Sequence, residues 1–145
     1  MIRDPRPEDF GPWRALFEAY VDFYRNEVPE DVTRATFDRL VQRRDGMFSL
    51  VAETESGEVV GMANALFHAS TWTMGPVCYL EDLFVAPVAR GTGVARQLIE
   101  AVAGRAREAG AEKLYWHTQE FNGPARSLYD LLANRVSFVV YERKP

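Results

Sequence analysis

Two adjacent carboxylates followed by a glycine-rich turn are the most chemically suggestive feature of the sequence. Glu81 and Asp82 lie within the strand-like run YLEDLFV, and the turn RGTG follows at residues 90–93. Because side chains alternate along a strand, we expect one carboxylate to face an acceptor pocket and the other to face elsewhere. A carboxylate that faces a pocket can remove a proton from a reacting group.

The turn at residues 90–93 has the composition of an anion-binding loop. It opens a segment with helical periodicity, so unpaired backbone N–H groups are expected beside the guanidinium of Arg90. A nucleoside-triphosphate loop is excluded because Val94 and Ala95 stand where lysine and a hydroxyl residue are needed. A dinucleotide-binding turn fits poorly because Arg96 occupies the place of its third small residue.

A third phosphate-binding design remains, the pyrophosphate loop of enzymes that use acetyl-coenzyme A. Arg90, Gly93 and Ala95 match its R-x-x-G-x-G/A signature, and the sequence here resembles the Gcn5-related N-acetyltransferase (GNAT) superfamily. The resemblance extends to the strand CYLEDLFV and to QEFNGPARSLYDLLA, which contains Asn122 and Tyr129. The N-terminal half looks like the branch that contains diamine, polyamine and related small-amine or amino-acid acetyltransferases.

The resemblance implies an acetyl-coenzyme A-dependent N-acetyltransferase that acts on a primary amine of a small molecule, such as a polyamine, a diamine or an amino acid, in a ternary complex. An aliphatic amine with a pKa near 10.4 is uncharged in only about one molecule in a thousand at neutral pH, so a base is needed. The resemblance implies that Glu81 is this base, directly or through water, and that Tyr129 protonates the leaving thiolate.

The resemblance, together with the positions of the residues in the sequence, suggests which residues bind the two substrates. The expected acetyl-coenzyme A contacts are Leu83, Phe84, Val85, Arg90, Gly91, Thr92, Gly93, Val94, Ala95, Asn122, Pro124 and Ala125. The expected contacts to the amine are Tyr24, Glu27, Asp82 and Trp116. Aromatic rings such as that of Tyr24 suit a cationic amine, although the same helical spacing is typical of a core-facing helix.

The hydrophobic pattern predicts a single α/β domain over residues 1–145. Helices are expected at residues 9–24, 32–41, 91–109 and 124–133, and strands at residues 47–53, 58–67, 77–85, 114–118 and 136–141. The resemblance implies a twisted, mixed and mostly antiparallel sheet of six to seven strands flanked by about four helices.

Composition narrows the possible partners. A chain of 145 residues with a net charge of −4 lacks the basic surface that nucleic acid requires. It has no apolar run of membrane-spanning length and no signal peptide, so we expect a soluble, cytoplasmic protein. The single cysteine, Cys78, and the two histidines form no metal-ligand spacing, so no metal is expected.

Two other functions remain open from the sequence. One is a catalytically silent domain that binds or senses acyl-coenzyme A, and the other is an acetyltransferase of protein lysine. The presence of both Glu81 and Tyr129 favours an enzyme over a binding domain. A homodimer is expected, because relatives commonly pair through their last strands and the run FVVY at residues 138–141 is apolar. Ser137 stands before Phe138 where the family usually has glycine, which affects the local path of this last strand.

Overall fold

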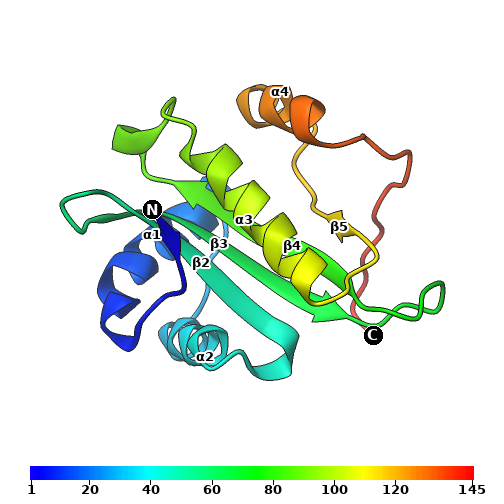
Figure 1. The fold of residues 1–145 in the computed structure, drawn as a ribbon, viewed down its shortest axis with the longest axis horizontal. Coiled ribbons are helices and arrows are strands. Elements are labelled where there is room, and N and C mark those ends of the chain that lie inside the picture. The colour runs from blue at the N-terminus through cyan, green and yellow to red at the C-terminus, as the bar shows by residue number, and fades with distance from the viewer.

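One open sheet of five strands forms the centre of the computed structural model, which describes residues 1–145 (Figure 1). The strands are β1 (Ile2–Arg3), β2 (Met47–Glu53), β3 (Val59–His68), β4 (Val77–Val85) and β5 (Leu114–Tyr115), and they lie side by side in chain order. Neighbours from β1 to β4 are antiparallel, and β5 runs parallel to β4. The expected mixed, mostly antiparallel sheet is confirmed.

Four α-helices flank the sheet, as expected. They are α1 (Phe10–Phe23), α2 (Glu30–Val41), α3 (Val94–Glu108) and α4 (Gly123–Leu132). Short 3-10 turns at Pro7–Asp9, Arg44–Gly46 and Pro87–Ala89 connect them to the strands. The α3 helix covers one face of the sheet, whereas α1 and α2 cover the other (Figure 1).

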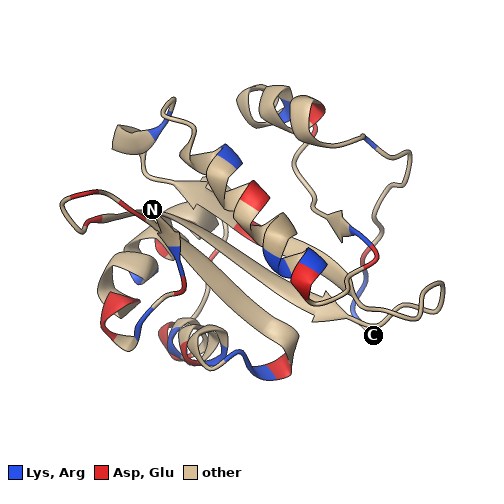
Figure 2. Ribbon diagram, viewed as in Figure 1, with Lys and Arg blue, Asp and Glu red and all other residues tan.

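The strands supply a separate hydrophobic core to each face because their side chains alternate. On the α3 face, Leu98 and Val102 pack against strand residues such as Leu50. On the opposite face, Trp13 of α1 and Phe37 of α2 pack with strand residues of β2 and β3. Charged residues lie mostly on helices and loops, and the strands carry few of them (Figure 2).

The sheet is smaller than the resemblance implied, and the strand expected at residues 136–141 is wrong. Residues 133–145 are irregular, and most apolar side chains of this segment are exposed: Val136, Phe138, Val139, Val140 and Tyr141. An apolar segment forms a strand only when a neighbouring strand completes its backbone hydrogen bonds. No other strand of the chain pairs with this segment. In contrast, β1 was missed because two residues show no periodicity.

The structure also bears on membranes and metals. None of the helices combines the length and the hydropathy that crossing a bilayer requires. No group of three or more His, Cys, Asp or Glu side chains is arranged to hold a metal ion.

Candidate active site

A β-bulge in β4 brings Glu81 and Asp82 to the same cavity. Across the β3–β4 ladder, Asn64 pairs with Asp82 and Ala65 pairs with Leu80, so Glu81 is an extra residue without a partner. Both acidic residues line one cavity of about 490 Å³. The expectation that they would lie on opposite faces is therefore wrong, because the inserted residue interrupts the alternation of side chains at this point.

The cavity lies between the two helices of one face and the strands beneath them. The α1 helix contributes Phe17, Tyr20 and Val21 to its wall, and Tyr24 follows at the end of that helix. The α2 helix contributes residues spaced one turn apart, including Arg39, and β3 and β4 form the floor. The cavity therefore depends on five elements, α1, α2, β2, β3 and β4, and on the loop between the two helices.

A buried hydrogen-bond network fixes the Asp82 carboxylate. The Asn64 side chain donates from Nδ2 to Asp82 Oδ2 over 3.0 Å. Asn64 Oδ1 accepts from Trp13 Nε1 at 3.2 Å and from Ser49 Oγ at 2.8 Å. Because an indole N–H only donates, the Asn64 oxygen must face Trp13, which directs the amide N–H toward Asp82. One asparagine thus connects α1, β2, β3 and β4 at the floor of the cavity.

The surroundings of Asp82 bring its pKa close to neutrality. Burial raises the pKa of Asp82 to about 6, and the nearby charge of Glu81 acts in the same direction. The hydrogen bond from Asn64 and the Tyr20 hydroxyl oppose this shift. A carboxyl group with a pKa of about 6 exchanges a proton or holds a cation near physiological pH, which is common at functional sites.

Tyr20 of α1 and Tyr24, which follows this helix, connect the cavity to the rest of the site. The Tyr20 hydroxyl donates to the Glu81 carbonyl oxygen at 3.0 Å, and its ring meets the ring of Tyr24 edge-on at 5.0 Å. Burial raises the pKa of Tyr24, and Thr118 and Asn122 beside its hydroxyl act in the opposite direction. Tyr24 thus lies between the acidic floor and the loop that leads into α4.

Tyr129 on α4 is held as a protonated phenol. Burial raises the pKa of Tyr129 to about 12, with a smaller contribution from Tyr24. Its ring packs edge-on against Trp116, with 5.4 Å between the ring centroids. A phenol with this pKa keeps its proton at neutral pH, so it can donate that proton to a leaving group.

The turn before α3 offers free backbone donors. Gly91 and Gly93 have φ angles of +76° and +86°, which side chains rarely adopt, so glycine is needed here for its conformation. No side chain caps α3, which leaves the N–H groups of its first turn, beginning at Val94, without intrahelical partners. Thr92 Oγ1 donates to the Ala89 carbonyl at 2.5 Å and Arg90 Nε to the Val85 carbonyl at 3.1 Å, which fixes the turn.

One edge of β4 is open beside the bulge. The β5 strand pairs with β4 only at Cys78 and Tyr79, so the backbone from Glu81 to Val85 has no strand on that side. An extended ligand with amide groups can pair with such an edge. The open edge ends at the glycine turn, so one elongated molecule can contact both.

Comparison with known proteins identifies the family. The family model described as acetyltransferase (GNAT) family matches residues 13–132. The chain belongs to the GNAT acetyltransferase family. The D-amino-acid N-acetyltransferase HPA3 of Saccharomyces cerevisiae is 34% identical to this GNAT protein over 144 residues, covering 99% of the chain and 89% of the relative.

Further relatives of this GNAT protein act on other amines according to their names. The thialysine N-epsilon-acetyltransferase of Mus musculus is 29% identical over 142 residues, covering 90% of the chain and 81% of the relative. A solved structure of the aminoglycoside acetyltransferase AAC(6')-Iy with the bisubstrate analog CoA-S-monomethyl-acetylneamine superimposes with a TM-score of 0.86 at 26% identity. This superposition covers 100% of the chain and 97% of the solved protein.

The GNAT fold brings some of the expected acceptor contacts together and separates others. Tyr24 and Asp82 line the cavity with Glu81. Glu27 is exposed just outside it, and Trp116 packs against Tyr129 instead of forming the wall.

The expected donor contacts fall into two groups. Residues of the β4 edge and of the turn at 90–95 follow one another along the chain. Asn122 precedes α4, and Pro124 and Ala125 lie in its first turn. The Asn122 side chain donates to Thr118 Oγ1 at 3.4 Å.

The cavity lining includes polar residues that were not expected from the sequence, such as Thr36. Asn64, Asn26 and Arg39 were not expected to take part, although each contributes to the cavity lining. Asn64 carried the clearest signal, because a single amide interrupts the apolar strand VVGMANALFH. A polar side chain in a buried strand requires partners, and here its partner is Asp82.

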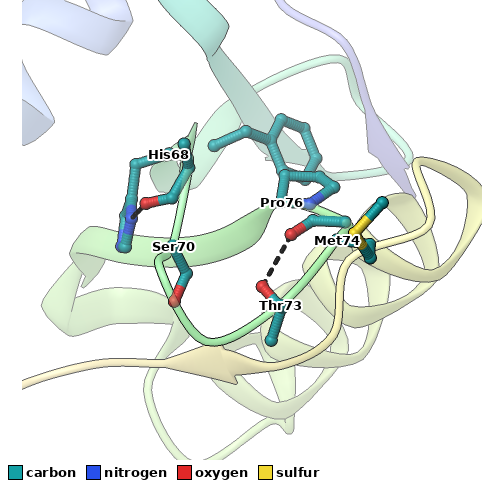
Figure 3. Close-up of a pocket in the computed structure, with 8 residues that line it drawn as sticks. His68, Ser70, Thr73, Met74 and Pro76 are labelled. Carbon is teal, nitrogen blue, oxygen red and sulfur yellow. Dashed lines mark hydrogen bonds between the residues drawn. The ribbon is translucent and has the colours of Figure 1, made fainter.

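A second cavity, of about 280 Å³, lies at the end of β3 and along the loop that follows (Figure 3). Neither Glu81 nor Asp82 lines this cavity. Thr73 Oγ1 donates to the Gly75 carbonyl at 2.8 Å within this loop. His68 lines the cavity, and its Nε2 lies 2.8 Å from the Tyr115 hydroxyl. These contacts give the loop its shape and leave His68 away from the acidic floor.

Proposed function

We propose that this chain transfers the acetyl group of acetyl-coenzyme A directly to a primary amine of a small molecule, with both substrates bound at once. Membership of the GNAT family makes the chain an acetyl-coenzyme A-dependent N-acetyltransferase. The observation that carries the mechanism is the bulge at Glu81, where the acidic cavity adjoins the open edge of β4.

The residues of the donor side fit acetyl-coenzyme A. The N–H groups at the start of α3 and the turn with Arg90 suit the pyrophosphate, which carries negative charge. The backbone of Leu83, Phe84 and Val85 suits the amides of the pantetheine arm. Asn122, Pro124 and Ala125 complete the donor side from the start of α4. The bound donor supplies an activated thioester.

The acidic residues prepare the amine. Glu81 takes a proton from the ammonium group, directly or through water, so that the nitrogen lone pair can attack the thioester carbonyl. Asp82 is held by Asn64 and orients the cationic acceptor. Tyr24 forms the aromatic wall beside it. Two acidic groups in one cavity favour a cation over a neutral amine at the binding step.

The leaving group is stabilised from the other side. Backbone N–H groups near Phe84 and Val85 polarise the thioester carbonyl while the new C–N bond forms. As the C–S bond breaks, Tyr129 donates its phenolic proton to the coenzyme A sulfur. No covalent enzyme intermediate is needed. Cys78 is unsuited as a nucleophile, because it is buried and burial raises the pKa of its thiol to about 11.

The acceptor is a polyamine, a diamine or an amino acid in this proposal. The names of the relatives support small molecules, since they include a D-amino-acid and a thialysine acetyltransferase. Two alternatives are a catalytically silent sensor of acyl-coenzyme A and an acetyltransferase of protein lysine. The paired acids and the protonated Tyr129 favour catalysis over sensing.

A thiol-release assay tests the proposed function. Acetyl-coenzyme A is combined with polyamines, amino acids and a lysine peptide in turn, and its binding is measured separately by calorimetry. We expect coenzyme A release with one class of small amine. Tight binding without turnover on any of these amines would support the sensor, and turnover of the peptide alone would support protein lysine.

We also propose that the chain forms a homodimer and acts in the cytoplasm. The exposed apolar run at residues 138–141 supports a homodimer, because an apolar segment of this size favours burial against a second copy. Sedimentation should give twice the mass of one chain, and replacing Phe138 and Val140 by serine should give monomers. A monomeric wild-type protein would contradict the proposal.

A further inference from the structure

One cationic side chain lines the cavity that Glu81 and Asp82 share. Arg39 is the single Lys or Arg side chain in its lining, and it comes from the last turns of α2. Its Nε donates to Asp45 at 2.9 Å, whereas neither Nη nitrogen donates a hydrogen bond within the protein. One edge of the guanidinium is thus fixed by Asp45, and the other donors remain available for an anion.

Neutral polar groups accompany Arg39 on the wall that α2 and the loop before it form. Asn26 lines the same cavity, and its Oδ1 accepts a hydrogen bond from the Glu27 backbone at 2.8 Å. This bond leaves the Asn26 amide N–H groups free to donate. Thr36 adds a hydroxyl one turn before Arg39 on α2. This wall therefore offers hydrogen-bond donors, whereas the floor at β4 offers hydrogen-bond acceptors.

The hydrogen-bond donors and the hydrogen-bond acceptors come from different sides of the cavity. Asp82 is on β4 and pairs with β3, whereas Arg39 belongs to α2, which packs on β2 at the other side of β3. Adjacent strands are about 4.8 Å apart, so β2 and β4 are separated by roughly 10 Å. Apolar side chains line the space between, among them Leu40 and Met47.

We propose that the acceptor carries a carboxylate as well as its amine, and that Arg39 binds this carboxylate while the acids of β4 receive the amine. This inference rests on the proposed acetyl transfer and narrows its acceptor to amino acids. The guanidinium fork matches a carboxylate in shape and charge. A diamine would instead bring a second ammonium toward Arg39, and like charges disfavour that complex.

The test compares acceptors that differ only in the carboxylate. The wild-type protein is assayed with ω-amino acids of two to six carbons and with alkylamines of the same length. We expect kcat/KM to favour the amino acid about tenfold at the chain length that spans the cavity, since charge-assisted hydrogen bonds are worth about this factor at a partly exposed site. The favoured length then measures the span from the acids to Arg39.

Variants of Arg39 assign the effect to this side chain. Arg39→Met should reduce the preference for the amino acid about tenfold, mainly through KM, and Arg39→Lys should keep part of it. Arg39→Glu should shift the preference toward diamines. The matched control is Arg34→Met, because Arg34 is an exposed arginine on the same helix that pairs with Asp38 and does not line the cavity.

Calorimetry of acetyl-coenzyme A and thermal melting show that the variants are folded. A wild-type protein that acetylates alkylamines without preferring the carboxylated acceptor would overturn this inference and leave the proposed acetyl transfer intact. An unchanged preference in Arg39→Met would also overturn it. If no amine were acetylated, the proposed function would fail, and this inference would fail with it.

Discussion

The proposed donor side and the proposed acceptor side of this protein are built from different parts of the chain. The donor side consists mainly of backbone groups, at the open edge of β4 and at the start of α3. The acceptor side consists of side chains from α1, α2, β2, β3 and β4 and from the loop between the two helices. Backbone donors survive most substitutions, whereas a cavity lined by side chains changes with each of them. The donor is therefore fixed by the fold, and the acceptor is set by the particular residues of this chain.

The largest effect is expected where the two sides meet. Glu81→Gln should lower kcat/KM by about 10²- to 10⁴-fold near pH 7, because the amine then loses its base. Raising the pH should relieve part of the loss as free amine accumulates. A pH–rate profile of the wild-type protein and the variant checks this, and a loss of equal size at every pH would remove Glu81 from the role of base.

A smaller loss is expected for the proton donor. Tyr129→Phe should lower kcat by about 10- to 100-fold, because the leaving thiolate is no longer protonated. Calorimetry should show nearly unchanged affinity for acetyl-coenzyme A. Tyr115→Phe is the matched control, since Tyr115 is also a partly buried tyrosine but its hydroxyl contacts His68. Equal activity of the Tyr129 variant and this control would contradict the assignment.

The donor side should respond to the backbone of the turn. Gly93→Ala forces a side chain into a φ of +86°, at a cost of about 1–2 kcal/mol. We expect roughly tenfold weaker binding of acetyl-coenzyme A and little change in KM for the amine. Gly104→Ala is the control, because this residue lies within α3 with open space around it. Equal affinities of the two variants would show that the turn does not hold the donor.

Burial of Asp82 on the acceptor side should affect the free energy of unfolding. Because burial raises the pKa of Asp82 to about 6, the folded state favours the protonated carboxyl, and this contribution is lost as the pH rises from about 4 through 6. Asp82→Asn should therefore increase the free energy of unfolding by about 1–3 kcal/mol at pH 7.5 and by almost nothing at pH 4.

Thermal melting of Asp82→Asn at both pH values measures this difference. Glu81→Gln is the comparison, since Glu81 is exposed and its removal relieves only the weaker repulsion of Asp82, so a smaller gain in stability is expected there. A destabilised Asp82→Asn at pH 7.5 would mean that the ionised carboxylate is compensated by its neighbours. Reduced activity together with increased stability would mark Asp82 as a functional residue.

The sequence predicted local features of the structure better than contacts between strands, for a physical reason. The turn at residues 90–93 and the strands β2 and β4 are local features, and the strand bounds agree with the expectation. The bulge at Glu81 depends on pairing with β3, and the contact from Asn64 to Asp82 joins different strands. Such features arise only when the sheet assembles. The C-terminal strand failed similarly, because an apolar pattern does not supply its pairing partner.

Direct transfer of the acetyl group between the two sides is tested by initial-rate kinetics in which the concentrations of both substrates are varied. If acetyl-coenzyme A and the amine occupy their separate sides together, double-reciprocal plots should intersect, and no acetylated protein should accumulate when the amine is left out. Parallel lines, together with an acetyl group found on Cys78 or another residue, would contradict the account, because transfer would then pass through the protein instead of between two bound substrates.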